Sequence, residues 1–162
     1  MAAEDYFLKI DGIDGESQDS KHKNEIELRS WSWSCTNAGS SSYGGGAGAG
    51  KVAMQDFHFN KKVDKGSAKL MQACASGQAF PTATAIVRKA GKDQQEYLKI
   101  TFSDVMISSY QLGGSGGGDP IPMDSISFNF GKIEFEYKEQ KSDGTLGGAV
   151  KGGWDLKQNK AT

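Results

Sequence analysis

The stretch that decides the fold is Ser125-Ile-Ser-Phe-Asn-Phe-Gly-Lys-Ile-Glu-Phe-Glu-Tyr137. Its apolar side chains occupy even positions up to Phe130 and odd positions from Ile133 onward, and Gly131 lies between the two series. Alternation with a period of two is typical of a β-strand with one buried face. A flat strand cannot bury both series on the same side, so the stretch predicts a bulge or bend at Gly131.

The same change of face recurs twice. The first case is a strand predicted over Glu25–Thr36, in which Ile26 and Leu28 lie on one face and Trp31, Trp33 and Cys35 on the other. In the second case, Val52 and Met54 lie on one face and Phe57 and Phe59 on the other. In the first case we expect the bend near Arg29-Ser30. Strands that change face are typical of a barrel or a two-sheet structure whose strands bend across a corner. Burial of both faces, one in the core and one against a partner chain, is the second explanation, and alternation alone does not separate the two.

The remaining pattern completes a mainly β domain with one flanking helix. Tyr6, Leu8 and Ile10 predict a first strand, and the polar residues 16–24 predict a solvated loop that includes His22. Asp64 can cap a helix with the apolar stripe Leu70, Met71 and Cys74, which Gly77 ends. Further strands are predicted over Thr84–Lys89, Glu96–Phe102, Val105–Leu112 and Gly152–Leu156. The Gly-rich stretches lie between strands that need each other, so residues 1–162 are expected to form a single domain.

Composition excludes several function classes. Nineteen basic and 20 acidic side chains leave a formal charge of −1, and they form no basic block of the kind that binds nucleic acid. The amino terminus lacks the features of a secretory signal, and no apolar run reaches membrane-spanning length. We therefore expect synthesis in the cytoplasm without a signal peptide and no membrane insertion. Cys35 and Cys74 are too few for a disulfide scaffold and are expected to be reduced and mostly buried.

Two short motifs resemble catalytic or nucleotide-binding signatures but lack the surrounding pattern. Gly45 and Gly50-Lys51 have the spacing of a phosphate-binding loop, but Val52 follows instead of Ser or Thr, and a strand pattern replaces the required helix. Ser115 lies in Gly113-Gly-Ser-Gly-Gly117, which formally matches a nucleophile elbow. Both histidines precede this serine, and Asp119-Pro120 leads into another strand. We interpret both motifs as loops.

Metal and cofactor sites are not indicated either. Two histidines and two cysteines stand at unrelated spacings, without the close pairs of zinc sites. His58 lies between Phe57 and Phe59, on the opposite face of its strand. Trp31 and Trp33 are interpreted as core residues, and Ser30, Ser32 and Ser34 as a small, uncharged stripe on the other face. No catalytic residue, metal or cofactor is predicted.

The order of these motifs resembles the Hcp family, the haemolysin-coregulated proteins of type VI secretion. The resemblance rests on Phe7-Leu-Lys-Ile10, Gly15-Glu-Ser17 with Asp19 and His22, Ser30-Trp-Ser-Trp33, Arg88-Lys-Ala-Gly91, Glu96-Tyr-Leu98, Val105 with Ser108-Ser109, Gly113-Gly-Ser-Gly-Gly117, Phe128-Asn-Phe130, Tyr137, Gln140-Lys141, Asp143-Gly144 and Gly153-Trp154. It covers nearly the whole chain. Cys35 is a departure, because many relatives carry a small or polar residue there.

The resemblance implies a two-sheet, β-barrel-like domain with one flanking α-helix, similar to phage tail-tube proteins. It implies a structural protein and no enzyme: hexameric rings stack into an inner tube, which a contractile sheath drives outward with a spike at its tip and effectors in its lumen. Ser30, Ser32 and Ser34 are the candidate lumen-facing residues. The candidate ring-stacking loop comprises Ser40, Ser41, Ser42, Tyr43, Gly44, Gly45, Gly46, Gly48 and Gly50.

Two other functions remain open on the sequence. A monomeric ligand-binding β-barrel, with the changes of face shaping an internal pocket, is the alternative from another class. A hydrolase that uses Ser115 is the third.

Overall fold

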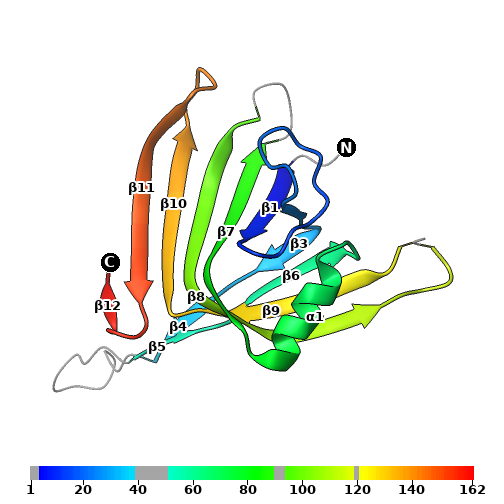
Figure 1. The fold of residues 1–162 in the computed structure, drawn as a ribbon. Helices are drawn as coiled ribbons and strands as arrows, with labels where there is room; N and C mark the ends of the chain where they lie inside the picture. The colour runs from blue at the N-terminus through cyan, green and yellow to red at the C-terminus, as the bar shows by residue number, and fades with distance from the viewer. Residues whose placement is uncertain (1–3, 39–50, 90–93, 119–120) are drawn as a thin grey trace.

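The computed structural model describes residues 4–38, 51–89, 94–118 and 121–162. Figure 1 shows a mainly β molecule with one helix, α1 (Ser67–Ser76). The strands are β1 (Glu4–Ile10), β2 (Ile26–Glu27), β3 (Ser30–Ser32), β4 (Cys35–Asn37), β5 (Val52–Met54), β6 (Phe57–Lys62), β7 (Ala79–Lys89), β8 (Glu96–Gly113), β9 (Met123–Asn129), β10 (Lys132–Gln140), β11 (Leu146–Asp155) and β12 (Lys160–Ala161).

The strands form two layers that share β8. The first layer has the order β12-β11-β10-β8-β7-β1-β2, and the second layer continues from β8 through β9 and β6 to β3. All these pairings are antiparallel, and β4 and β5 form a separate two-stranded sheet. The predicted mainly β, two-sheet fold with one helix is confirmed, and the sheets are open rather than closed into a barrel.

Strand β8 turns from one layer into the other at Asp104. Phe102, Val105 and Ile107 are all buried, although strict alternation would place Phe102 and Val105 on opposite faces. Asp104 has a positive φ of 55°, and this left-handed residue switches the face of the strand. The sequence pattern predicted two strands here, and the structure forms one bent strand.

In the stretch Ser125–Tyr137, the sequence predicted one bent strand and the structure forms two. Its two halves are separate strands, β9 in the second layer and β10 in the first, and the chain crosses between them at Phe130-Gly131. The predicted break near Arg29-Ser30 is likewise a crossing, because β2 pairs with β1 and β3 pairs with β6. Both crossings agree with the explanation that the chain turns a corner between two layers.

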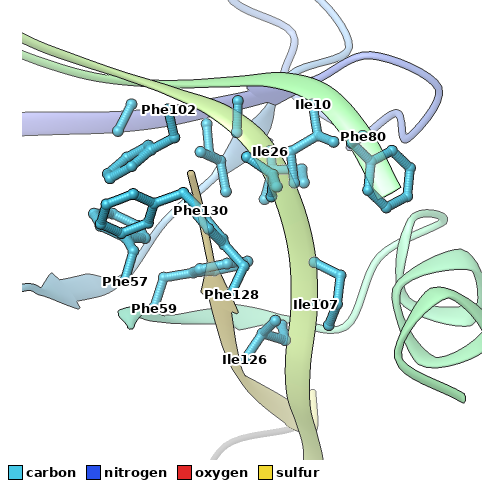
Figure 2. Close-up of a cluster of buried hydrophobic side chains, with 14 of the residues drawn as sticks. Ile10, Ile26, Phe57, Phe59, Phe80, Phe102, Ile107, Ile126, Phe128 and Phe130 are labelled. Atoms are coloured by element: carbon cyan, nitrogen blue, oxygen red, sulfur yellow. The ribbon is translucent and has the colours of Figure 1, made fainter. Parts of the chain in front are cut away.

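Aromatic side chains fill the space between the layers (Figure 2). Phe57 is fully buried, and its ring centroid lies 5.1 Å from the ring centroids of both Phe102 and Phe128. Trp31 stacks on Phe57 at 5.9 Å, and Trp33 also packs against the core while remaining half-exposed. The two tryptophans therefore close the rim of the core, and Phe57 occupies its middle.

Some predicted core positions are wrong. Cys35 is exposed, because the alternation of β3 ends before Cys35 enters β4, whose partner is β5 alone. On α1, Met71 is exposed and Ala73 is buried in its place beside Leu70. Cys74 is half-buried, and both cysteines are free. Gly77 ends the helix with a φ of 70°, which confirms the predicted C-terminus.

The loop between β1 and β2 is packed rather than solvated, contrary to the sequence interpretation. His22 is buried, and its ring stacks on Phe7 with the centroids 4.3 Å apart. Its Nδ1 lies 2.7 Å from a Glu25 oxygen, and its Nε2 lies 2.5 Å from a Glu96 oxygen. Gly15 permits this packing, because a Cβ there would lie 2.5 Å from the carbonyl oxygen of Glu25. The loop thereby covers the back of β1 and β7.

A buried charge network joins the second layer to α1. Lys61 Nζ donates to Asp124 Oδ2 at 2.6 Å, to Asp64 Oδ1 at 2.9 Å and to Ser67 Oγ at 2.9 Å. Tyr110 donates to the second oxygen of Asp124 at 2.8 Å. Lys61 and Asp124 are fully buried and are direct cross-strand partners in β6 and β9. Each charge is therefore compensated inside the protein.

Lys61→Met should strongly destabilise the protein, because it leaves the Asp124 carboxylate buried without a counter-charge. We expect a loss of about 3–5 kcal/mol in the free energy of unfolding, measured by urea denaturation. Lys62→Met is the matched control: Lys62 is exposed, and the change should stay within about 0.5 kcal/mol. Equal stability of the two variants would contradict the assigned role of the network.

The loop between β1 and β2 should also make the free energy of unfolding depend on pH in the acid range. The hydrogen bonds from Arg88 lower the pKa of Asp19 from 3.8 to about 2. Because the folded pKa lies below the unfolded one, Asp19 stabilises the protein above about pH 4, and this contribution is lost as the pH falls toward 2. Urea denaturation from pH 5 to pH 2 should give Asp19→Asn a shallower loss of stability than wild type. Equal slopes for Asp19→Asn and wild type would contradict this role of Asp19.

Candidate functional site

The outer face of the second layer carries small polar side chains that alternate with the core residues of the same strands. In β6, His58 and Asn60 alternate with Phe57 and Phe59. Alternation along a strand sends successive side chains to opposite faces, so the core residues fix which residues face outward. The same rule applies to β3, β8 and β9.

Strand register arranges these outward side chains in two rows across the layer. One row is Ser32, His58, Ser127 and Ser109, and the next is Ser30, Asn60, Ser125 and Gln111. We call these eight residues the polar face. It contains no carboxylate, ammonium or guanidinium group, and none of its side chains is longer than that of Gln or His. These two rows form a neutral surface of low relief, and Lys62, the next outward residue of β6, lies beyond them.

Hydrogen bonds within the polar face hold His58 and Asn60 in place. His58 lies between two serines, with Nδ1 3.0 Å from Ser127 Oγ and Nε2 3.1 Å from Ser125 Oγ. Asn60 donates to Ser30 Oγ at 2.8 Å. Since both ring nitrogens of His58 have serine partners in the neighbouring strand β9, the imidazole is fixed in position.

The predicted serine stripe lies partly on this face. Ser30 and Ser32 are exposed in β3, and the exposed Ser34 follows that strand, with its carbonyl accepting from the backbone N–H of Gln55 at 2.9 Å. Trp31 and Trp33 alternate with them and pack against the core. The candidate ring-stacking residues between Ser40 and Gly50 lie outside the described residues.

The sequence interpretation missed most of the polar face. His58 was placed opposite its phenylalanine neighbours, but its serine partners were not identified. Ser125 and Ser127 alternate with Ile126 and Phe128, so the signal for an outward orientation was present. Alternation along one strand does not predict the register that brings β3, β6 and β9 side by side.

Within the described residues, neither His58 nor Ser115 belongs to a Ser–His–carboxylate arrangement. His58 contacts two serines, but no hydrogen bond to a carboxylate orients it as in a catalytic triad. Ser115 accepts a bond from the backbone N–H of Gly117 at 3.5 Å, and both histidines have other partners. Within the described ranges, no group of three or more His, Cys, Asp or Glu side chains is placed to hold a metal ion.

Among the described residues, aromatic and aliphatic side chains fill the space between the layers, where an internal ligand pocket would have to lie (Figure 2). This finding disfavours the ligand-binding barrel. Among the described residues, no helix combines the length and apolar character needed to cross a membrane. The geometry defines a class: an open, two-layered, mainly β protein with one helix and a row of small polar side chains on the outer face of its second layer.

Comparisons with known proteins identify the family. Residues 7–137 match the family described as "Type VI secretion system effector, Hcp". The chain is 50% identical to Protein hcp1 of Pseudomonas aeruginosa over 159 residues, which is 97% of this chain and 98% of that protein. Among solved structures, Hcp1 from Salmonella typhimurium matches with a TM-score of 0.82 and 37% identity over 99% of this chain and all of that one. A structure described as a type six secretion system protein matches with a TM-score of 0.92 and 34% identity, covering 98% and 99%.

The chain belongs to the Hcp family of type VI secretion proteins. This confirms the resemblance found in the sequence.

Proposed function

We propose that the protein is the subunit of the inner tube of a type VI secretion system, forming hexameric rings that stack into a tube. The observation that carries this proposal is the polar face. A tube that conducts different cargo proteins needs an inner wall without charged or protruding side chains, and the two rows of Ser, His, Asn and Gln meet that need. In this proposal the polar face, which includes Ser30 and Ser32, lines the lumen together with the neighbouring Ser34 and contacts effectors.

The remaining partners follow from family membership. We propose that rings stack through the segment Ser40–Gly50, that a spike protein lies at the tube tip, and that a contractile sheath drives export. The protein itself would leave the cytoplasm with its effectors by this route and reach the medium or a target cell. Neither nucleic acid nor membrane insertion has a part in this function, and no cofactor or reaction is required of the chain.

Assembly tests the proposal directly. At micromolar concentration the purified protein should give a native mass of six chains, and negative-stain images should show rings with a central hole. The monomeric ligand-binding barrel would instead give a compact particle of one chain. Sedimentation that finds only monomer would rule out the ring.

Ser32→Gln should separate effector binding from assembly. Ser32 is exposed at the end of a polar row, so the change should alter the free energy of unfolding by no more than about 0.5 kcal/mol and leave rings intact. The longer side chain should reach over His58 and weaken the capture of at least one co-expressed effector several-fold in pull-down assays. Ser142→Gln, at an exposed serine outside the polar face, is the matched control and should capture normally. Equal capture by both variants would remove the polar face from effector binding.

A further inference from the structure

The tip of the loop between β1 and β2, residues 18–23, lies against the outer side of the first layer. Behind the tip, the backbone N–H of Asn24 donates to the carbonyl of Ser17 at 2.9 Å and closes the neck of the loop. This bond stays within the loop and does not tie the tip to the sheet. Contacts to the sheet come from the side chains of Asp19 and His22, whose partners lie in β7 and β8.

Both ring nitrogens of His22 face a carboxylate. Nδ1 lies 2.7 Å from a Glu25 oxygen, and Nε2 lies 2.5 Å from a Glu96 oxygen. A neutral imidazole has a single N–H, so it can donate to one carboxylate while its other nitrogen directs a lone pair at the second. An imidazolium has two N–H groups and can donate to both. The geometry therefore fits the charged ring.

The burial of this contact makes the loss of a proton costly. The side chain of His22 is 5% exposed and that of Glu25 is 13% exposed, so little water is present to replace a lost partner. The ring also stacks on Phe7, with the centroids 4.3 Å apart. A buried polar group that loses its partner is destabilised by the full cost of its desolvation. An imidazole with one proton would therefore oppose a carboxylate at close range in a nearly dry site.

Other charged groups surround His22 on the loop and on the outward sides of the four strands beneath it. They are Asp19, Lys21, Lys23 and Glu25 in the loop, Asp5 and Lys9 in β1, Glu27 in β2, Arg88 in β7, and Glu96 and Lys99 in β8. Among the described residues, the hydrogen bonds of the His22 ring go to Glu25 and Glu96. The protons of the ring therefore serve these two carboxylates.

We propose that His22 is a proton-dependent latch for the tip of this loop. While the ring is charged, it ties the tip to Glu96 in β8. When rising pH removes one proton, one of the two carboxylates loses its donor, and the tip is released from the first layer. The sign follows from linkage: the latched state needs a proton that the released state does not, so rising pH favours release.

A second contact of the same tip responds to pH in the opposite direction. Arg88 donates to both carboxylate oxygens of Asp19, and these bonds lower the pKa of Asp19 to about 2. Acid therefore opens the Asp19 contact and base opens the His22 contact, so the tip is held most firmly between the two extremes. Its release would uncover Phe7, which is 3% exposed in the latched state.

Hydrogen exchange measured by mass spectrometry on the purified protein tests the latch. From about pH 6 to about pH 9, protection of residues 18–23, corrected for the intrinsic exchange rate, should fall about tenfold or more in wild type. Peptides from β6 and β9 should keep their protection. His22→Gln should show low protection of the tip at both pH values. Lys23→Gln, which changes an exposed charge in the same tip, is the matched control and should keep the wild-type profile.

Glu96→Gln should keep the tip latched at about pH 9. A neutral His22 can donate from Nδ1 to Glu25 and accept at Nε2 from the N–H of the new amide. A charged His22 can donate to the amide oxygen instead, so both forms of the ring are satisfied. The variant should therefore lose the pH dependence of wild type while keeping its protection.

Several outcomes would overturn the latch. Equal protection of the wild-type tip at both pH values would mean that the contact does not need the second proton. The same loss in Glu96→Gln as in wild type would remove the two carboxylates as its cause. A loss at high pH that includes β6 and β9 would be a loosening of the whole protein rather than a release of the tip. If His22→Gln does not fold, the comparison of wild type with Glu96→Gln decides alone.

Discussion

Strand β8 belongs to both layers, and the rest of the structure depends on this constraint. Its first half pairs with β7 and β10 and its second half with β9, and the left-handed residue Asp104 turns the strand between them. Because one continuous strand joins the layers, the aromatic side chains of both meet at a fixed corner. The same corner offsets the layers, since β10 and β11 lie on one side of the first half while the second half runs past α1 with β9.

Local patterns in the sequence predicted where the chain changes face, but they could not predict what the change would be. At Gly131 the change is a crossing from β9 to β10, and at Asp104 it is a bend within β8, although the sequence suggested the reverse in both cases. The outcome depends on which distant strands pair on each side of the break. Alternation contains no information on that pairing, whereas the helix end at Gly77 is a local event and was predicted correctly.

In the candidate site, too, local features could be predicted from the sequence and long-range pairing could not. The outward orientation of Ser30 and Ser32 could be read from their tryptophan neighbours, because alternation is local. The polar face as a whole needs the register of β3, β6 and β9, which joins Ser32 to His58 and Ser127. His22 was misassigned for a related reason, since its burial depends on a stacking contact with Phe7 and on a carboxylate in β8.

Register also connects the buried charge network to the polar face. A buried ion pair usually adds little net stability over apolar residues, because desolvation offsets the attraction between the charges. The ion pair does strongly penalise other registers of β6 relative to β9. A one-residue slip of β6 would expose Lys61, bury His58 and leave Asp124 without its partner. We infer that the network serves to fix this register. By drawing Lys61 inward, the network also keeps that charge away from the two rows of the polar face, while the exposed Lys62 lies beyond them.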